Sequence, residues 1–170
     1  MAIDNCKYSF QELSQIILPK YMKNMWEKIT SPVQMSMFAE NGVGKATAFK
    51  KLGIQKDFSG CYVLIENDSP IYVGISRSII SRLLQHVKGT THFDATLAYR
   101  MANEDIKHSL SRSYAMQTVE MKNQFERAKA RISKMDVAFI EIINDIEIYL
   151  FEAYCAMELD TKKWNTFATH

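Results

Sequence analysis

The sequence contains few of the residues that mark secreted, disulfide-bonded or membrane proteins. Its three cysteines, Cys6, Cys61 and Cys155, are odd in number, far apart and in no metal-ligand spacing, so we expect reduced thiols. No hydrophobic run approaches the length of a membrane span, and the opening MAIDNCKYSF lacks the charged start and apolar run of a secretory signal. We therefore expect a cytoplasmic protein that has no membrane partner.

The sequence also has no large excess of charge of one sign, because the formal net charge is only +2. Such a balance neither requires nor excludes a nucleic-acid partner, since phosphate binding depends on how positive charge is clustered. With six glycines and three prolines there is no linker or low-complexity tract, and a hydrophobic content of 47% is sufficient for a folded domain. The segment GVGK is not a nucleotide-binding loop, because Ala39 and Ala46 replace its first glycine and its hydroxyl residue.

Helical and strand patterns alternate in a way that predicts an α+β fold. Apolar residues recur at helical spacing over Phe10–Ile29, and Pro19 is expected to divide this run into two helices. Two segments rich in Val, Ile and Tyr, 61–65 and 71–75, flank the turn residues ENDSP and predict a β-hairpin with a five-residue loop. A third strand is predicted at 136–143.

These elements predict a small, three-stranded, mostly antiparallel sheet flanked by helices. We assign residues 1–57 to an N-terminal helical extension and residues 58–170 to the main domain. Residues 88–135 form a helical insert within that domain, with helices expected at 95–107 and 113–134.

The predicted hairpin places two tyrosines close together. A turn centred on Asp68 sets Tyr62 opposite Gly74 and Leu64 opposite Tyr72, so that all four share one face of the sheet. The other face carries the apolar residues expected in the core. Because glycine has no side chain, we expect open space beside Tyr62, where a substrate backbone could approach.

Two later helices supply the remaining candidate residues. After the hairpin, Arg82 and His86 are related as i and i+4 and project together from a face other than the buried one. In the helix predicted at 146–159, Glu152 falls within an apolar stripe, a costly place for a carboxylate without a partner. Glu147, like Glu141 and Glu158, is expected to be solvated.

Each of these residues has an ordinary structural interpretation when it is taken singly. Tyrosines are common strand residues, and Arg82 and His86 alone are more often a solvated helix face. Asn165 alone is typical of a turn or a helix cap. It is their occurrence together and in order that favours a functional site.

Taken in that order, the residues Gly60-Cys61-Tyr62, Tyr72-Val73-Gly74, Arg82, His86, Glu152 and Asn165 resemble the motifs of the GIY-YIG nuclease domain. The resemblance covers about Phe58 to the C-terminus, with Cys61 in place of the family's isoleucine. The closing WNTFATH also resembles a C-terminal signature of some members. The long insert and the N-terminal segment lie outside the resemblance, so it does not predict a DNA sequence specificity.

The resemblance implies a role for each residue in the hydrolysis of a DNA phosphodiester. Tyr62 would be the general base, which requires nearby cations because a phenol has a pKa of about 10. Arg82 would neutralise the attacked phosphate, while Tyr72 and His86 would hydrogen-bond the phosphate or its neighbours. Glu152 would hold one Mg²⁺ or Mn²⁺ ion together with water and substrate oxygens, and Asn165 would brace the site.

Positive residues of the insert suggest where DNA would bind. The segment MKNQFERAKARISK is rich in lysine and arginine, and its Arg127 and Arg131 could track phosphates or simply form a solvated helix face. Arg77 and Lys88, which flank the helix carrying Arg82, could extend such a surface, and Gly74 would admit the DNA backbone.

The sequence thus predicts a divalent-metal-dependent endonuclease acting in restriction, repair, mobile-element transfer or antibacterial attack. The alternative is a catalytically silent nucleic-acid-binding module of the same fold. A nuclease that cuts both strands of a symmetric site is expected to be a homodimer, although no dimer face is visible in the sequence.

Overall fold

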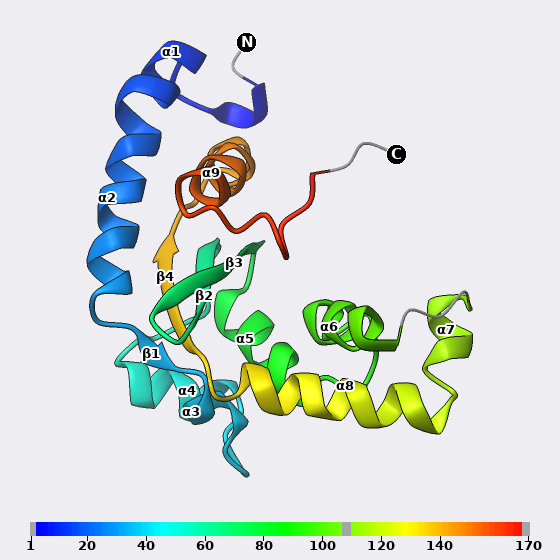
Figure 1. The fold of residues 1–170 in the computed structure, drawn as a ribbon. Helices are drawn as coiled ribbons and strands as arrows, with labels where there is room; N and C mark the ends of the chain where they lie inside the picture. Colours follow the sequence, from blue (N-terminus) through cyan, green and yellow to red (C-terminus); the bar gives the residue numbers. More distant parts are fainter. Residues whose placement is uncertain (1–2, 107–109, 168–170) are drawn as a thin grey trace. The chain divides into compact units, whose positions relative to one another are not determined.

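The computed structural model describes residues 3–106 and 110–167 and divides into two compact units (Figure 1). The first unit contains Met1–Val33, Lys56–Ile79 and Asp136–His170, and the second contains Gln34–Gln55 and Ile80–Met135. The predicted α+β class is confirmed. No helix within the described residues is long and apolar enough to cross a membrane. The boundary placed at residue 57 stays a prediction.

The sheet has four strands instead of the predicted three. Its order is β1 (Val33–Gln34), β4 (Asp136–Glu141), β2 (Gly60–Glu66) and β3 (Ser69–Ser76), and β2 pairs antiparallel with both β3 and β4. The prediction missed β1 because a strand of two residues is too short to show the alternation of a strand.

The hairpin of β2 and β3 has the predicted register. Tyr62 pairs with Gly74 and Leu64 with Tyr72. The loop is shorter than predicted, because the strands continue to Glu66 and Ser69 and leave only Asn67 and Asp68 as a two-residue turn. Both turn residues have positive φ, 50° and 61°, a conformation that asparagine and aspartate tolerate and that matches the twist of a hairpin.

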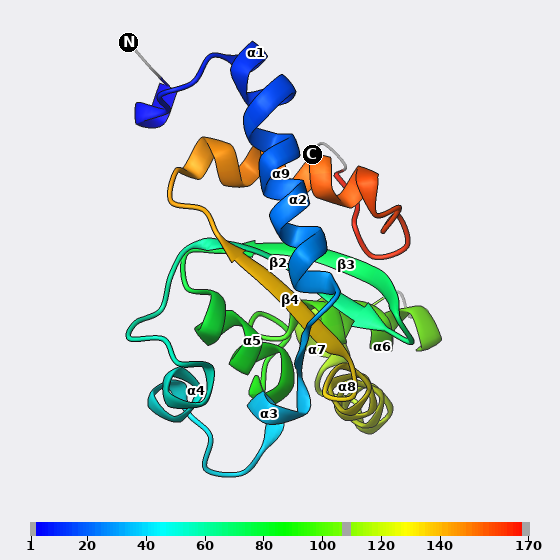
Figure 2. The ribbon, with the colours of Figure 1, turned by 90° about the vertical axis from the view of Figure 1, so that its left-hand side faces the viewer.

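One face of the sheet is covered by α2 (Leu18–Ile29) and α9 (Asp145–Glu158), and Figure 2 shows α2 running across the strands. The core between them is built from alternate residues of β2, as the hairpin register requires. Its central members are Leu18, Met22, Met25, Cys61, Val63, Val73, Ala138, Ile140, Ile148, Phe151 and Cys155. Tyr62 and Leu64 therefore point to the opposite face.

The sequence predicted that Pro19 would divide the N-terminal helical run, and this prediction is wrong. The run continues from α1 (Phe10–Glu12) through a π-helical turn at Leu13–Ile17 into α2. The N–H of Leu18 bonds to the carbonyl of Leu13, five residues back. Proline has no N–H to donate, and widening the preceding turn accommodates it without breaking the helix.

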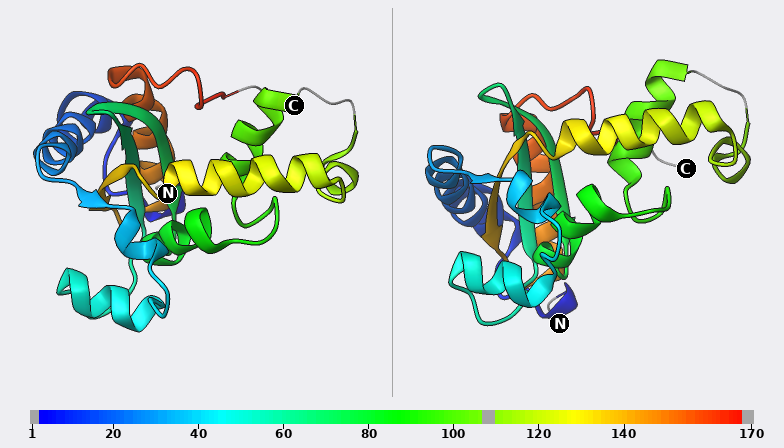
Figure 3. Two further views of the ribbon diagram at one scale, coloured as in Figure 1. Left: turned by 60° about the horizontal axis from the view of Figure 1, so that its bottom comes forward. Right: turned by 90° about the horizontal axis from the view of Figure 1, so that it is seen from below.

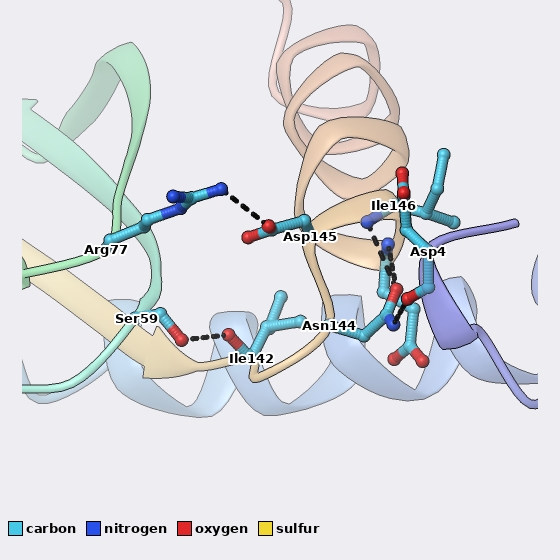
Figure 4. A network of polar contacts seen from close by, with 8 residues as sticks. Asp4, Ser59, Arg77, Ile142, Asn144, Asp145 and Ile146 are labelled. Atoms are coloured by element: carbon cyan, nitrogen blue, oxygen red, sulfur yellow. Dashed lines mark hydrogen bonds and ion pairs between the residues drawn. The ribbon is translucent and has the colours of Figure 1, made fainter.

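The start of α9 is fixed by hydrogen bonds of Asn144 (Figure 4). Its Oδ1 accepts from the N–H groups of Ile146 and Glu147 at 3.1 and 3.2 Å, a standard N-cap, and its Nδ2 donates to the carbonyl of Asp4 at 2.9 Å. Nearby, the hydroxyl of Ser59 donates to the carbonyl of Ile142 at 2.8 Å. These bonds set where α9 begins, and hence where Glu152 lies on the sheet.

The second unit is helical. Its elements are α3 (Ser36–Ala39), α4 (Lys45–Leu52), nearly all of α5 (Ile79–Lys88), α6 (Thr96–Ile106), α7 (Arg112–Ala115) and α8 (Val119–Ile132). Helices α6 and α8 pack against each other, and their axes cross, as the two views of Figure 3 show. The first helix predicted for the insert corresponds to α6, although its predicted end, Lys107, lies outside the described residues. The second, predicted at 113–134, is divided into α7 and α8 by a break at residues 116–118.

Candidate active site

Tyr62 and Gly74 form a close pair at the centre of the hairpin. A Cβ added at Gly74 would lie 2.4 Å from both Cζ and the hydroxyl oxygen of Tyr62, far inside van der Waals contact. The ring of Tyr62 therefore fills the space that the sequence predicted to be open for a substrate backbone. Glycine is needed here to admit the phenol, a cross-strand arrangement in which an aromatic ring covers a glycine.

Tyr72 lies beside this pair on the same face. The ring centroids of Tyr62 and Tyr72 are 6.1 Å apart and their planes are inclined by 56°. This spacing is that of a favourable aromatic pair. Tyr62 is only 1% exposed, whereas Tyr72 is half-buried. The two phenols are thus neighbours, as predicted, and Tyr72 is the more accessible.

Asn165 braces the hairpin from the segment that follows α9. Its Oδ1 accepts from the N–H of Val73 and its Nδ2 donates to the carbonyl of the same residue, both at 2.8 Å. Because β3 is an edge strand, these backbone groups have no strand partner on that side, and the amide of Asn165 takes the place of one. Val73 lies between Tyr72 and Gly74, so the clamp fixes the second tyrosine motif.

Glu152 lies on α9, which packs against β2 and β3. It is half-buried, and burial raises the pKa of its carboxyl group. Among the described residues none donates a hydrogen bond to this carboxylate or forms an ion pair with it. The carboxylate also contributes to raising the pKa of Cys61, although burial and the thiol of Cys155 are larger causes. Glu152 therefore lies on the face of the sheet opposite Tyr62.

Arg82 and His86 lie on α5, in the second unit. The guanidinium of Arg82 is held by the loop before α6, through bonds of 2.8 Å to the carbonyl of Asp94 and to the hydroxyl of Thr96. The sequence predicted that His86 would project from a face other than the buried one, but His86 is fully buried. Burial lowers its pKa to about 3, with a smaller contribution from the charge of Arg82. The imidazole is therefore neutral at physiological pH.

The residues predicted to contact DNA have different surroundings. Arg77 is exposed and forms an ion pair of 2.7 Å with Asp145 (Figure 4). The ammonium of Lys88 donates to the carbonyls of Glu40 and Val43 at 2.7 and 2.5 Å, so it holds the loop between α3 and α4.

Helix α8 presents the other predicted DNA contacts. Arg127 and Arg131 are exposed one turn apart. Lys129, in the same basic segment, is buried instead, and its ammonium bonds to the carbonyl of Gly89 at 3.0 Å and to Glu126 at 2.8 Å. The exposed arginines remain candidates for phosphate contacts, but the basic segment does not present all its charges to solvent.

The most buried acid of α9 is Glu147, which the sequence predicted to be solvated. It is 6% exposed, and its Oε2 accepts from the hydroxyl of Tyr21 at 2.6 Å. The thiol of Cys6 approaches its other oxygen at 3.9 Å. The prediction failed because both partners come from more than 120 residues away in the sequence. No local pattern around Glu147 reveals them.

Among the described residues, no cluster of three or more His, Cys, Asp and Glu side chains could hold a metal ion. A single carboxylate with water and substrate oxygens is still a sufficient ligand set for Mg²⁺. Glu152 has the features of such a ligand, because its partly buried oxygens have no partner within the described chain.

Comparisons with known proteins find no relative of this chain. No protein-family model matches it, and no curated protein and no solved structure matches it. The resemblance of the motifs to the GIY-YIG domain therefore stands on the residues themselves.

Proposed function

We propose that this protein is a divalent-metal-dependent endonuclease that hydrolyses DNA phosphodiester bonds, in the manner of GIY-YIG nucleases. One arrangement carries the proposal. Tyr62 lies over Gly74, Tyr72 lies beside both, and Asn165 clamps the intervening Val73. Four residues of the motifs, from three segments of the chain, thus meet on one hairpin. Packing alone would not require an amide to hold the strand between the tyrosine and the glycine.

In this proposal Tyr62 acts as a phenolate and accepts a proton from the attacking water. The water oxygen forms a bond to phosphorus as the bond to the 3′ oxygen breaks, and the 3′ oxygen leaves with a proton from solvent. Arg82 stabilises the negative charge of the phosphate, for which its forked guanidinium is well suited. Tyr72, the more accessible phenol, hydrogen-bonds the phosphate or the water. The neutral His86 acts as a hydrogen-bonding group and not as a cation, because of its low pKa.

Glu152 would hold the Mg²⁺ or Mn²⁺ ion. When bound, such an ion neutralises charge on the phosphate and on the leaving oxygen. The partly buried, unpartnered carboxylate supports this role, since a bound cation would offset the cost that raises its pKa. Arg127 and Arg131 supply exposed positive charge for the DNA backbone, and Arg77 could join them if its ion pair with Asp145 opened.

A catalytically silent nucleic-acid-binding module remains the second candidate. Three observations favour it. Tyr62 is almost completely buried, and Arg82 already donates to groups of its own unit. Glu152 lies on α9, which covers the face of the sheet opposite Tyr62. A general base has to reach water, so the enzyme would need the surroundings of Tyr62 to open when DNA binds.

The two candidates are separated by incubation of the purified protein with supercoiled plasmid, in Mg²⁺, in Mn²⁺ and in EDTA. The enzyme is expected to nick or cut the plasmid only with metal, and Tyr62→Phe should lose at least about a hundred-fold in rate. Tyr149→Phe, an exposed tyrosine of α9, is the matched control and should cleave normally. Binding of DNA without cleavage of plasmid, branched or single-stranded DNA would favour the silent module.

A further inference from the structure

The second unit contains a cavity that the proposed active site does not use. Its volume is about 520 Å³, within the range of pockets that hold small ligands. It lies between the loop after α5, helix α7 and helix α8. The lining residues are Thr90, Thr91, His92, Phe93, Ser113, Met116, Lys122, Phe125 and Glu126, and all of them belong to this one unit.

Aromatic groups form much of the wall. Phe125 is buried on α8, while Phe93 is 74% exposed at the edge of the cavity. The ring of Phe93 lies on that of His92, with centroids 4.0 Å apart, and His92 in turn lies 5.7 Å from Tyr99. The outermost ring of this stack leaves an aromatic face open to solvent, which is a platform for another planar group.

Two polar side chains of the lining, His92 and Lys122, have no hydrogen-bond or ion-pair partner among the described residues, whereas the hydroxyl of Thr91 bonds to Asp94. His92 is 8% exposed, yet its ring nitrogens make no hydrogen bond with any described residue. Its nitrogens are not among the fully buried side-chain atoms that lack a partner in the described chain, so the imidazole edge is accessible to a ligand. Lys122 likewise forms no ion pair within the described chain. Glu126 differs, because its carboxylate is held by Lys129 at 2.8 Å.

We propose that this cavity binds a single nucleotide, with its base stacked on Phe93 and its phosphate at Lys122. An exposed aromatic face favours a planar base, and a lysine with nearby hydroxyl groups favours a phosphate. The imidazole of His92 supplies a hydrogen bond to the base. The nucleotide is either free in solution or an unpaired nucleotide of a DNA strand, and only the second source rests on the proposed function.

Calorimetric titration of the full-length protein in EDTA tests the free source. The probes are AMP, adenosine, which lacks the phosphate, and ribose 5-phosphate, which lacks the base. AMP is expected to bind at least ten-fold more tightly than either fragment. Phe93→Ala and Lys122→Ala should each weaken AMP binding about ten-fold. The matched controls are Phe10→Ala, an equally exposed phenylalanine, and Lys23→Ala, an exposed lysine, and both should bind as the wild type does.

The strand source is tested with a short single-stranded oligonucleotide that carries one 2-aminopurine. The fluorescence of 2-aminopurine increases when the base unstacks from its neighbours to enter the cavity, and this increase should be lost in Phe93→Ala. Glu152→Ala protein is used in EDTA, so the result does not depend on cleavage and a chain without nuclease activity would still give it. AMP binding that both variants weaken, or a fluorescence increase that Phe93→Ala abolishes, supports the cavity as a nucleotide site. No response in both experiments, or responses that these variants leave unchanged, would overturn it.

Discussion

Two turns of α9 carry acids in opposite situations. Glu147, in the first turn, is 6% exposed and receives a hydrogen bond of 2.6 Å from Tyr21. Glu152, in the middle of the helix, is half-buried, and no described residue bonds to its carboxylate. A buried acid with a good partner is part of the fold, whereas a partly buried acid without one bears a cost that the fold does not repay. The second situation is that of a group whose partner comes from outside the chain.

The contrast between Glu147 and Glu152 also shows how the N-terminal segment supports α9. Tyr21 on α2 and Cys6 before α1 both contact Glu147, and Asp4 accepts a hydrogen bond from Asn144 at the start of the same helix. The N-terminal residues thus fix the beginning of α9, and through it the position of Glu152.

The largest expected effect on stability comes from His86, a buried base that can be compared with the two acids Glu147 and Glu152. Its pKa of about 3 in the folded state lies below the value of about 6.5 expected when unfolded. The unfolded chain therefore binds the proton more readily, and stability should fall as the pH drops below 6.5 towards 3. Between pH 7 and pH 4.5 the loss should be about 2.5 kcal/mol, measured by urea unfolding. His86→Gln should lose correspondingly less, and an equal loss in both proteins would contradict the account.

Gly74→Ala should have the next largest effect, because the new methyl group must displace the ring of Tyr62. We expect a loss of about 2 kcal/mol in the free energy of unfolding, as for other overpacked sites, together with loss of cleavage. The control is Gly44→Ala, where an added Cβ meets nothing within 4 Å. Because Gly44 is the N-cap of α4, a position that disfavours alanine, the loss should be about 0.5 to 1 kcal/mol, smaller than at Gly74. Equal stability of the two variants would show that Tyr62 does not lie over Gly74.

Tyr21→Phe tests the partner of Glu147 directly. Removing the hydroxyl leaves a buried carboxylate without its best donor, and the expected cost is about 1.5 kcal/mol, measured by thermal or urea unfolding. Burial and Glu147 raise the pKa of Tyr21. The wild type should therefore lose stability as the pH rises above 10, where the unfolded phenol ionises, and the variant should lose less. A variant as stable as the wild type would remove the contrast between the two acids.

Glu152→Gln should have the smallest effect on stability. Removing a charge that burial disfavours should leave the free energy of unfolding at pH 7 unchanged or higher by up to about 0.5 kcal/mol. The same unfolding measurement checks it. A large loss would mean that Glu152 has a structural partner and belongs with Glu147.

The local parts of this account could be predicted from the sequence. Alternation along the two strands predicts that Tyr62, Tyr72 and Gly74 share one face, and their pairing agrees with the prediction. The turn differs, because a two-residue turn and a shift of register between Leu64 and Ile65 replace the predicted five-residue loop. The long helices of the insert follow from their periodicity. What depends on distant segments could not be predicted in this way, and Glu147 with Tyr21 is the clearest case.

Two other differences between the predicted and the observed structure also arise from contacts that a local sequence pattern does not reveal. The basic segment that contains Lys129 is expected to be solvated because a charge on a helix usually is, yet Lys129 is buried and bonds to the carbonyl of Gly89, forty residues earlier. The space at Gly74 was predicted to be open because a one-dimensional pattern shows that a side chain is absent and not which neighbour fills the gap. Here the neighbour is the phenol of Tyr62.

The most direct test of the proposed nuclease is plasmid cleavage in Mg²⁺ by Glu152→Gln beside Glu147→Gln, at a temperature at which both variants remain folded. The account predicts that Glu152→Gln loses at least about a thousand-fold in cleavage rate while it still binds DNA, and that Glu147→Gln cleaves at a rate close to that of the wild type. Wild-type cleavage by Glu152→Gln would contradict the central claim and remove Glu152 from the site.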